Sequence, residues 1–381
     1  MRKVIIAIDS FKGCLTSIEA GQAAKEGVAC VFPDCEIFLL PVADGGEGIL
    51  DALLSTMKGK YIQVTAHDPL MNPVQAIYGI SGGAKTALIE MASVSGLPLV
   101  PANKRNPMLT TSFGTGELIK DALKRGCRDF IIGIGGSATN DAGLGMLQAL
   151  GFRFLDKNGN ALGVGGKILI EVASIDTSSA YPALKEAWFI VACDVHNPFY
   201  GPNGAAHIYA RQKGADDNMI EELDAGMRSL ANIIRQTTGK DIATYPGTGA
   251  AGGMGGGCLA FLNATLKPGI KLLLDTLCFE EKIRNADLII TGEGRADRQT
   301  AMGKLPFGIL KEAEKQHIPV VVIAGSIEDV TWLNEAGFRS VFTITPGPVS
   351  PEKAMEPGFA KANIKRLVSQ LCYIIYTFKS T

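Results

Sequence analysis

The sequence predicts an α/β protein whose flavodoxin-like domain is built from both ends of the chain. In residues 1–60 and again in 286–381, short apolar segments typical of strands buried on both faces alternate with helical patterns. Residues 61–285 follow a different pattern, which predicts a large inserted second α/β domain. The apolar segments of the outer parts predict a parallel five-stranded sheet.

The first segment begins with a strand over 4–8. A helix follows at Thr16, because Thr16-Ser-Ile-Glu19 has the form of a capping box. A second strand is expected over 36–40, and Asp44-Gly-Gly-Glu47 repeats the capping pattern before another helix.

The last segment supplies the other strands, over 288–291, 320–324 and 341–345. Helices are expected between and after them, at about 303–316, 328–336 and 353–378. In the usual order 2-1-3-4-5, the strands 4–8 and 288–291 are neighbours at the point where the order reverses. Ligands bind there, so Asp9 to Lys12 and Gly292 to Asp297 should face one site.

The inserted segment begins with three short strands separated by Pro, Asn and Gly turns, which predict an antiparallel meander. Its other expected strands and helices follow in a mixed order. In chain order the expected elements are strands 61–65, 75–80 and 86–91, helix 115–125, strand 130–134, helix 142–150, a hairpin over 152–160, strand 188–193, two helices within 218–236, a Gly-rich helix start over 247–262 and a helix over 270–284.

Composition and charge favour a small ligand. The formal net charge of −1 argues against nucleic acid or an anionic membrane, which need a basic field. The eight cysteines have irregular spacings and no C-x-x-C pair, so neither a zinc site nor a disulfide framework is supported. No stretch approaches the ~20 apolar residues of a membrane span, and we expect a cytoplasmic protein.

Two glycine-rich stretches imitate nucleotide-binding loops. Gly79-Ile-Ser-Gly-Gly-Ala-Lys-Thr86 has Ala in place of the second glycine of a phosphate loop and strand patterns on both sides, so we interpret it as a hairpin turn. Gly133 to Ala138 follows a strand, opens a helix and has Asp156 beyond it, as in a dinucleotide fingerprint. Asp156-Lys-Asn-Gly159 is itself a strong turn sequence, which accounts for the acid without a ribose.

The stretch Gly135-Gly-Ser-Ala-Thr-Asn-Asp141 is also a candidate phosphate cradle. It combines hydroxyl and amide side chains with backbone N–H groups expected at a helix N-terminus. We favour phosphate binding over dinucleotide binding, with simple helix capping as the third possibility. The candidate phosphate-binding residues are Gly135, Gly136, Ser137, Thr139 and Asn140.

Asp194 ends the strand expected over 188–193. A carboxylate at that place can hold Mg²⁺ or accept a proton from an alcohol, although an Asp before Asn-Pro can also simply begin a turn. His196 and His207 lack the spacing of a metal pair. The glycine-rich run 247–257 is costly in a helix, which indicates close approach to a ligand or to another loop.

Distinctive motifs follow one another along nearly the whole chain. They are Asp9-Ser-Phe-Lys-Gly13, Pro41-Val-Ala-Asp-Gly-Gly-Glu-Gly48, Ile89-Glu-Met-Ala92, Thr110-Thr-Ser-Phe-Gly-Thr-Gly-Glu-Leu-Ile119, Gly135-Gly-Ser-Ala-Thr-Asn-Asp141, Ala192-Cys-Asp-Val195, Gln212-Lys-Gly-Ala215, Gly249-Ala-Ala-Gly-Gly253 and Thr291-Gly-Glu-Gly-Arg295. In this order they resemble the motifs of the bacterial glycerate kinase family, of the glycerate 2-kinase type. Ile8 and Arg211 stand where such proteins usually carry Pro, and both departures lie beside expected site loops.

The resemblance implies transfer of the γ-phosphate of ATP to D-glycerate with Mg²⁺, usually giving 2-phosphoglycerate. On this hypothesis Lys12 and Arg295 bind the carboxylate or the moving phosphoryl group, and Asp194 is the metal ligand or base. The expected substrate-binding residues are Asp9, Ser10, Asp44, Glu293 and Asp297, of which Asp44 and Asp297 are alternates for the role of Asp194. A dinucleotide-dependent oxidoreductase acting on a hydroxy acid and a non-catalytic sugar-acid-binding protein remain the alternatives.

Overall fold

The structure is a computed structural model that describes residues 1–40, 42, 49–298 and 300–379. It divides into two compact units, one formed by 1–56 with 270–381 and the other by 57–269. The segment 270–285, which we expected in the insertion, packs with the chain ends. That the units are independent domains remains a prediction.

The first unit contains the predicted parallel sheet. In the described part of the chain it has five strands in the order β13-β12-β11-β1-β2, which is 2-1-3-4-5 in chain order and confirms the flavodoxin-like prediction. The strands are β1 (Lys3–Ile8), β2 (Glu36–Leu39), β11 (Leu288–Ala296), β12 (Val320–Ile327) and β13 (Ser340–Thr343).

Strand β11 is longer than the sequence predicted. We expected the strand to end at residue 291, but Gly292 to Ala296 continue it and pair with β12 up to Ile327. Gly292 suits this pairing, because a Cβ atom there would lie 2.2 Å from the carbonyl oxygen of Ile323. Strand β1 stops opposite Gly292, so the charged end of β11 extends past its neighbour.

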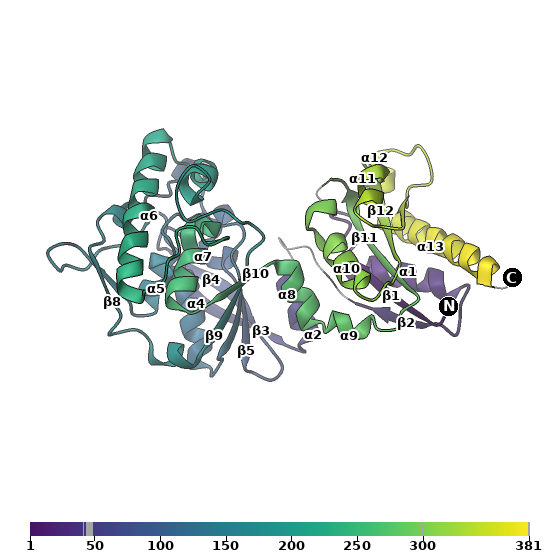
Figure 1. Ribbon diagram of the computed structural model, residues 1–381, viewed down its shortest axis with the longest axis horizontal. Helices are drawn as coiled ribbons and strands as arrows, with labels where there is room; N and C mark the ends of the chain where they lie inside the picture. The colour runs from purple at the N-terminus through teal and green to yellow at the C-terminus, as the bar shows by residue number, and fades with distance from the viewer. Residues whose placement is uncertain (41, 43–48, 299, 380–381) are drawn as a thin grey trace. The chain divides into compact units, whose positions relative to one another are not determined.

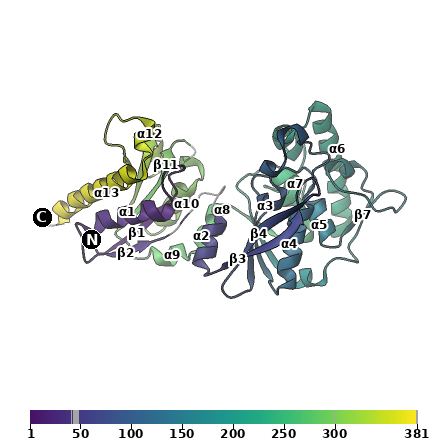
Figure 2. The same ribbon diagram turned by 180° about the vertical axis from the view of Figure 1, so that it is seen from behind.

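Helices cover both faces of this sheet. The predicted capping box of Thr16 and Glu19 begins α1, whereas the second capping pattern, with Asp44, lies outside the described residues. Helix α1 packs against α13 over one face and α10 covers the other, as the two opposite views show (Figures 1 and 2). The helices of this unit are α1 (Ser17–Ala29), α2 (Ile49–Thr56), α8 (Gly269–Thr276), α9 (Phe279–Lys282), α10 (Leu305–Glu314), α11 (Val330–Glu335), α12 (Pro351–Ala354) and α13 (Pro357–Lys379).

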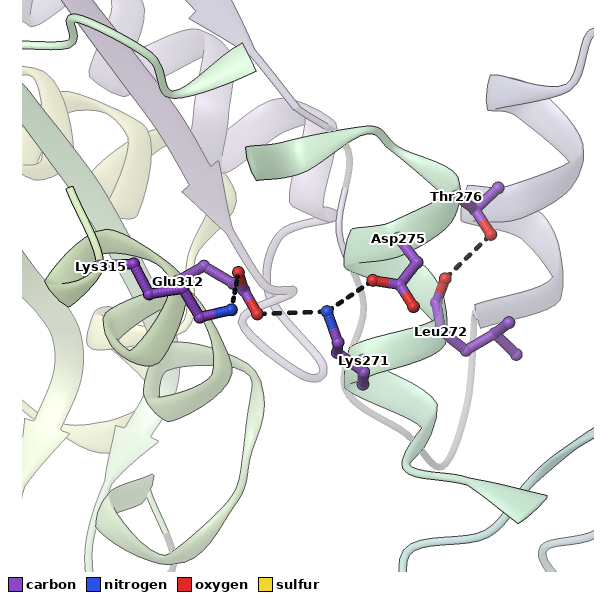
Figure 3. A network of polar contacts seen from close by, with 6 residues as sticks. All are labelled: Lys271, Leu272, Asp275, Thr276, Glu312 and Lys315. Atoms are coloured by element: carbon purple, nitrogen blue, oxygen red, sulfur yellow. Dashed lines mark hydrogen bonds and ion pairs between the residues drawn. The ribbon is translucent and has the colours of Figure 1, made fainter. Parts of the chain in front are cut away.

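A polar network joins α8 to α10 (Figure 3). The Lys271 ammonium lies 2.6 Å from Asp275 and 3.3 Å from Glu312, and Lys315 lies 2.6 Å from the other oxygen of Glu312. Glu312 is buried, so its two lysine partners offset the cost of removing a carboxylate from water.

We predicted one helix over 270–284, but Cys278 has a positive φ of 49° and separates α8 from α9.

The second unit is built on a mixed sheet. In the described residues its order is β10-β9-β6-β5-β4-β3, and β3, β4 and β5 form the predicted antiparallel meander. Residues 79–86 form the predicted hairpin turn, because β4 and β5 pair on either side of it. Strands β5, β6, β9 and β10 are parallel, so their carboxyl ends meet at one edge. The strands are β3 (Lys60–His67), β4 (Pro73–Ile80), β5 (Thr86–Glu90), β6 (Asp129–Gly133), β9 (Trp188–Ala192) and β10 (Thr265–Lys267).

The helices of this unit share one apolar core with the sheet. The predicted helix start at Ala142 is wrong, because Ala142 and Gly143 have positive φ and the helix begins at Leu144. The two helices expected within 218–236 are one continuous helix. The helices are α3 (Ala92–Ser95), α4 (Phe113–Lys124), α5 (Leu144–Ala149), α6 (Asp217–Thr238) and α7 (Ala250–Phe261).

The hairpin-like stretch expected over 152–160 is confirmed in part, because residues 156–160 form a turn and Leu155 makes an antiparallel bridge with Ala161 across it. Strand β7 (Arg153–Leu155) also pairs with the distant β8 (Ser174–Asp176), which the sequence did not predict. Among the described residues, no helix combines the length and apolar character needed to cross a membrane.

Candidate functional site

The loop after β1 and the end of β11 line one pocket in the first unit, as the strand order predicted. The Asp9 amide donates to the carbonyl of Gly292 at 2.8 Å, which fixes the two segments side by side. The pocket has a volume of about 510 Å³. The predicted site residues that line it are Asp9, Ser10, Lys12, Glu293, Arg295 and Asp297, while Asp44 lies outside the described residues.

A buried carboxylate organises the floor of this pocket. Glu293 is 7% exposed and accepts a hydrogen bond of 2.7 Å from the hydroxyl of Thr300. The Lys304 ammonium lies 3.6 Å from Glu293 and 3.7 Å from Asp297. Sequence reasoning missed Thr300 and Lys304, because a Thr and a Lys just before a helix carry no signal of their own.

The two predicted cations reach the pocket on exposed side chains. Lys12 sits in a tight turn in which the Phe11 amide donates to Leu15 at 2.9 Å and Gly13 has a φ of 75°. Arg295 pairs with Glu328 at 3.2 Å on the surface. An exposed pair of this kind contributes little stability, so Arg295 can change partners at small cost. That both cations share one anion stays a prediction.

Asp194 stands at the carboxyl edge of the sheet in the second unit. It follows β9, is exposed, and accepts a hydrogen bond of 2.8 Å from the Gly269 amide just beyond β10. Among the described residues, no cluster of three or more His, Cys, Asp or Glu side chains could hold a metal ion. Mg²⁺ commonly binds through one or two carboxylates together with substrate phosphates and water. A single exposed carboxylate such as Asp194 fits that mode of binding.

The loop after β6 presents backbone outward and side chains inward. Gly135 and Gly136 are exposed, whereas Thr139 and Asn140 are completely buried. The Thr139 hydroxyl and the side-chain amide oxygen (Oδ1) of Asn140 have no hydrogen-bond partner among the described residues. Their side chains cannot touch a phosphate in this conformation, so direct contact would fall to the exposed Gly135 and Gly136 and to Ser137, which is 7% exposed.

The helix N-terminus that we expected to hold a phosphate is already occupied by Asp141. This buried carboxylate accepts hydrogen bonds from the amides of Gly143 at 3.1 Å and Gly145 at 3.3 Å. It also accepts from the amide and the hydroxyl of Ser112, at 2.8 and 2.9 Å, just before α4. Asp141 therefore joins the starts of two helices. The prediction that the N–H groups at the start of α5 are available to a phosphate is wrong in part, because Asp141 accepts from two of them.

The glycine-rich run at the start of α7 approaches the same loop. A Cβ atom on Gly252 would lie 2.1 Å from the carbonyl oxygen of Thr139, and the Ala142 amide donates to the carbonyl of Gly252 at 3.0 Å. Gly252 has a φ of 67°, which glycine adopts without strain. The close approach predicted from composition is therefore an approach to another loop.

Lys213 lies beneath the loop and was not singled out from the sequence beyond its motif. Its ammonium, 2% exposed, donates to the Ser137 hydroxyl and to the Thr139 carbonyl, both at 2.7 Å. Burial lowers its pKa from 10.5 to about 7, with the Asp141 carboxylate opposing the shift. The Gln-Lys-Gly pattern was the only sequence signal for this contact.

Asp156 has the turn role that we favoured over ribose binding. Its carboxylate accepts hydrogen bonds from the amides of Asn158 at 2.8 Å and Asn160 at 2.9 Å. These bonds lower the pKa of the Asp156 carboxyl group. The acid expected of a dinucleotide fingerprint is thus used within its own turn.

Comparisons with known proteins agree along the whole chain. The model of the glycerate kinase family matches residues 4–376. Glycerate 2-kinase of Escherichia coli (strain K12) is 48% identical over 343 residues, covering 90% of each chain. Glycerate kinase of Bacillus subtilis (strain 168) is 47% identical over 355 residues, covering 93% of each chain. A crystal structure from Salmonella typhimurium LT2, whose protein is provisionally named glycerate kinase 2, is 41% identical with a TM-score of 0.90 and full coverage of both chains.

Proposed function

The chain belongs to the glycerate kinase family, and on that premise we propose that it transfers the γ-phosphate of ATP to D-glycerate and releases 2-phosphoglycerate. Family membership makes the chain a phosphotransferase, whereas the donor, the acceptor and the position of the new phosphate are parts of the proposal. The observation that carries it is the 48% identity to a glycerate 2-kinase over nine-tenths of both chains.

In the proposed reaction the 2-hydroxyl oxygen of glycerate attacks the γ-phosphorus. The new P–O bond forms as the bond to the β–γ bridging oxygen breaks, ADP leaves with the electron pair, and the hydroxyl proton passes to a carboxylate. Such a reaction asks the protein mainly for positioning and for stabilisation of negative charge.

We assign the residues of the two units to these tasks. Gly135, Gly136 and Ser137 bind nucleotide phosphates, with Thr139 and Asn140 supporting the loop from within. Lys12 and Arg295 bind the glycerate carboxylate or the moving phosphoryl group. The remaining polar groups of the first pocket, assigned to substrate binding, are Asp9, Ser10, Glu293 and Asp297.

Asp194 is proposed as the residue that holds Mg²⁺ or accepts the hydroxyl proton. Its exposure at a strand end supports either role. When bound, Mg²⁺ would neutralise charge on the phosphate oxygens as they transfer. A cytoplasmic location is also proposed, because a kinase that uses ATP needs the nucleotide pool of that compartment.

The test is an assay of the pure protein with D-glycerate, ATP and Mg²⁺. We expect ADP to form in proportion to glycerate consumed, and ³¹P NMR of the product to show 2-phosphoglycerate. Formation of 3-phosphoglycerate would correct the position alone. Hydride transfer to a nicotinamide without ADP would favour the oxidoreductase, and binding of glycerate without turnover would favour a non-catalytic protein.

A further inference from the structure

The contact between Lys213 and Ser137 determines which way the serine hydroxyl can point. When Lys213 is protonated, its ammonium has only hydrogens to give, so at 2.7 Å the Ser137 oxygen is the acceptor. The hydrogen of the Ser137 hydroxyl is then directed elsewhere. In the part of the chain that the structure describes, no acceptor for that hydrogen is recorded within hydrogen-bond distance.

At Ser137 the backbone of this loop is held by bonds that do not involve Lys213, whose second bond goes to the carbonyl of Thr139. The Leu97 amide donates to Gly136 at 2.8 Å, and the Ala138 amide donates to Ser95 at 2.9 Å. These two bonds flank Ser137 and fix its backbone in a short bridge with Gly96. Lys213 therefore adds something other than anchorage of the chain at Ser137, namely the direction of the hydroxyl and a buried positive charge behind it.

Burying an ammonium at this place lowers the stability of the fold unless its charge interacts with an opposite charge or serves a function. An apolar side chain of similar volume often gives equal or greater stability than a buried charge. Here the two bonded acceptors are a neutral hydroxyl and a neutral carbonyl. The Asp141 carboxylate, the counter-charge in this region, already accepts from several amides and hydroxyls.

We propose that Lys213 is a positioning residue that orients the Ser137 hydroxyl as a hydrogen-bond donor to an anionic oxygen of a substrate bound at Gly135 to Ser137. The ammonium polarises the hydroxyl through the hydrogen bond that it donates, and this strengthens the bond that the hydroxyl donates in turn. The inference rests on the proposed function, which places a substrate anion at this loop.

The anion can be a phosphate of ATP or the carboxylate of glycerate, since both offer charged oxygen acceptors. Separate Michaelis constants distinguish them. If the anion is a nucleotide phosphate, loss of Lys213 raises the KM for ATP and leaves that for glycerate nearly unchanged. The reverse result assigns the loop to glycerate.

The experiment compares Lys213→Met with a matched control, Lys240→Met. Lys240 also lies in the second unit, and it donates to the carbonyl of Leu259 at 3.0 Å and to the side chain of Asn263 at 3.1 Å, away from the loop. We expect K213M to raise the KM for one substrate by about 10- to 100-fold, the range for a hydrogen bond to a charged group. K240M should leave both constants within about two-fold, as expected for a site away from the loop.

A double-mutant cycle shows whether Lys213 acts through Ser137. Ser137→Ala removes the proposed donor, so K213M/S137A should be no worse than K213M alone. If the fold-changes in KM of the two single variants multiply in the double variant, the two residues act independently and the inference is overturned. The affinity for ADP and for glycerate, measured by calorimetry on the same variants, gives a readout that does not depend on turnover.

The outcomes separate this inference from the function on which it rests. Wild-type protein that makes no ADP would end the proposed function. If the wild type makes ADP but K213M and S137A both keep its KM values and affinities, the proposed kinase function stands and the proposed role of Lys213 is contradicted. If K213M does not fold, S137A decides alone, because an unchanged KM in that variant also contradicts the proposal.

Discussion

Two lysines, one in each unit, contrast in how their charges are balanced. Lys304 in the first pocket has a side chain 25% exposed and lies between two carboxylates, at 3.6 and 3.7 Å. Lys213 in the second unit is 2% exposed and donates to neutral oxygens at 2.7 Å. The long contacts of Lys304 allow it to change partners when an anion arrives, whereas the short ones of Lys213 fix it in place.

This contrast assigns different tasks to the two regions. In the first, the exposed cations Lys12 and Arg295 line a pocket together with largely buried carboxylates, and the cations can contact a ligand directly. In the second, the buried lysine acts on a ligand only through the loop above it. Asp194 is the exception in the second unit, because it is exposed and charged at the same sheet edge.

The largest effect is expected at Asp194. Asp194→Asn keeps an oxygen for the Gly269 amide but removes the charge, so kcat should fall by ~100-fold or more while the melting temperature barely moves. Asp241→Asn is the matched control, since Asp241 also accepts from a backbone amide, that of Ala243 at 3.0 Å. An unchanged kcat would mean that Asp194 has a structural role and takes no part in the reaction.

Removal of the two exposed cations of the first pocket tests direct contact there. Lys12→Ala and Arg295→Ala should each lower kcat/KM for glycerate by about 10- to 150-fold, because each loses charge-assisted hydrogen bonds. If they share one anion, the double mutant should depart from additivity by at least ~0.5 kcal/mol. Strict additivity would mean separate sites.

Glu328→Gln is the control for Arg295. It removes the negative charge that pairs with Arg295 on the surface and leaves the guanidinium in place. We expect kcat/KM to stay within about two-fold, because an exposed pair contributes little. A loss as large as that of R295A would show that Glu328 positions the arginine.

A stability effect should distinguish the buried carboxylate of the first pocket from its exposed surroundings. Thr300→Val removes the 2.7 Å donor of Glu293 and the 2.9 Å acceptor of the Asp297 amide, and it should lower the free energy of unfolding by about 1–3 kcal/mol in urea titrations. Thr276→Val, whose hydroxyl donates to the helix carbonyl of Leu272 at 2.9 Å, serves as the control and should cost less. Equal losses would mean that Glu293 does not depend on this bond.

The last prediction concerns the change of stability with pH that follows from the burial of Lys213. Its folded pKa is lowered from 10.5 to about 7, so above about pH 7 the unfolded chain binds more protons than the folded one. This group therefore makes the wild type more stable relative to K213M as pH rises from about 7 towards 9. Urea titrations at both values measure this difference, and parallel pH profiles of the two proteins would contradict the burial of a titrating lysine.

The sequence by itself determined the features that depend on local pattern and on strand order. Thr16 and Glu19 cap α1 because a capping box needs only residues three apart. Asp9 and Gly292 meet because parallel strands of a doubly wound sheet end at one edge, and the apolar segments were enough to order those strands. The Asp156 turn was predictable for the same local reason.

Only the tertiary structure decided the contacts between segments that are distant along the chain. β11 continues past Gly292 because β12 pairs with it, and local turn preference cannot anticipate a partner strand. Asp141 accepts from Ser112, and Lys213 donates to Ser137 and Thr139, from segments separated by 29 to 76 residues. A hydrogen bond needs both groups in place, and these groups come together only when the chain has folded. The sequence therefore marked the residues of the site without showing which of them act together.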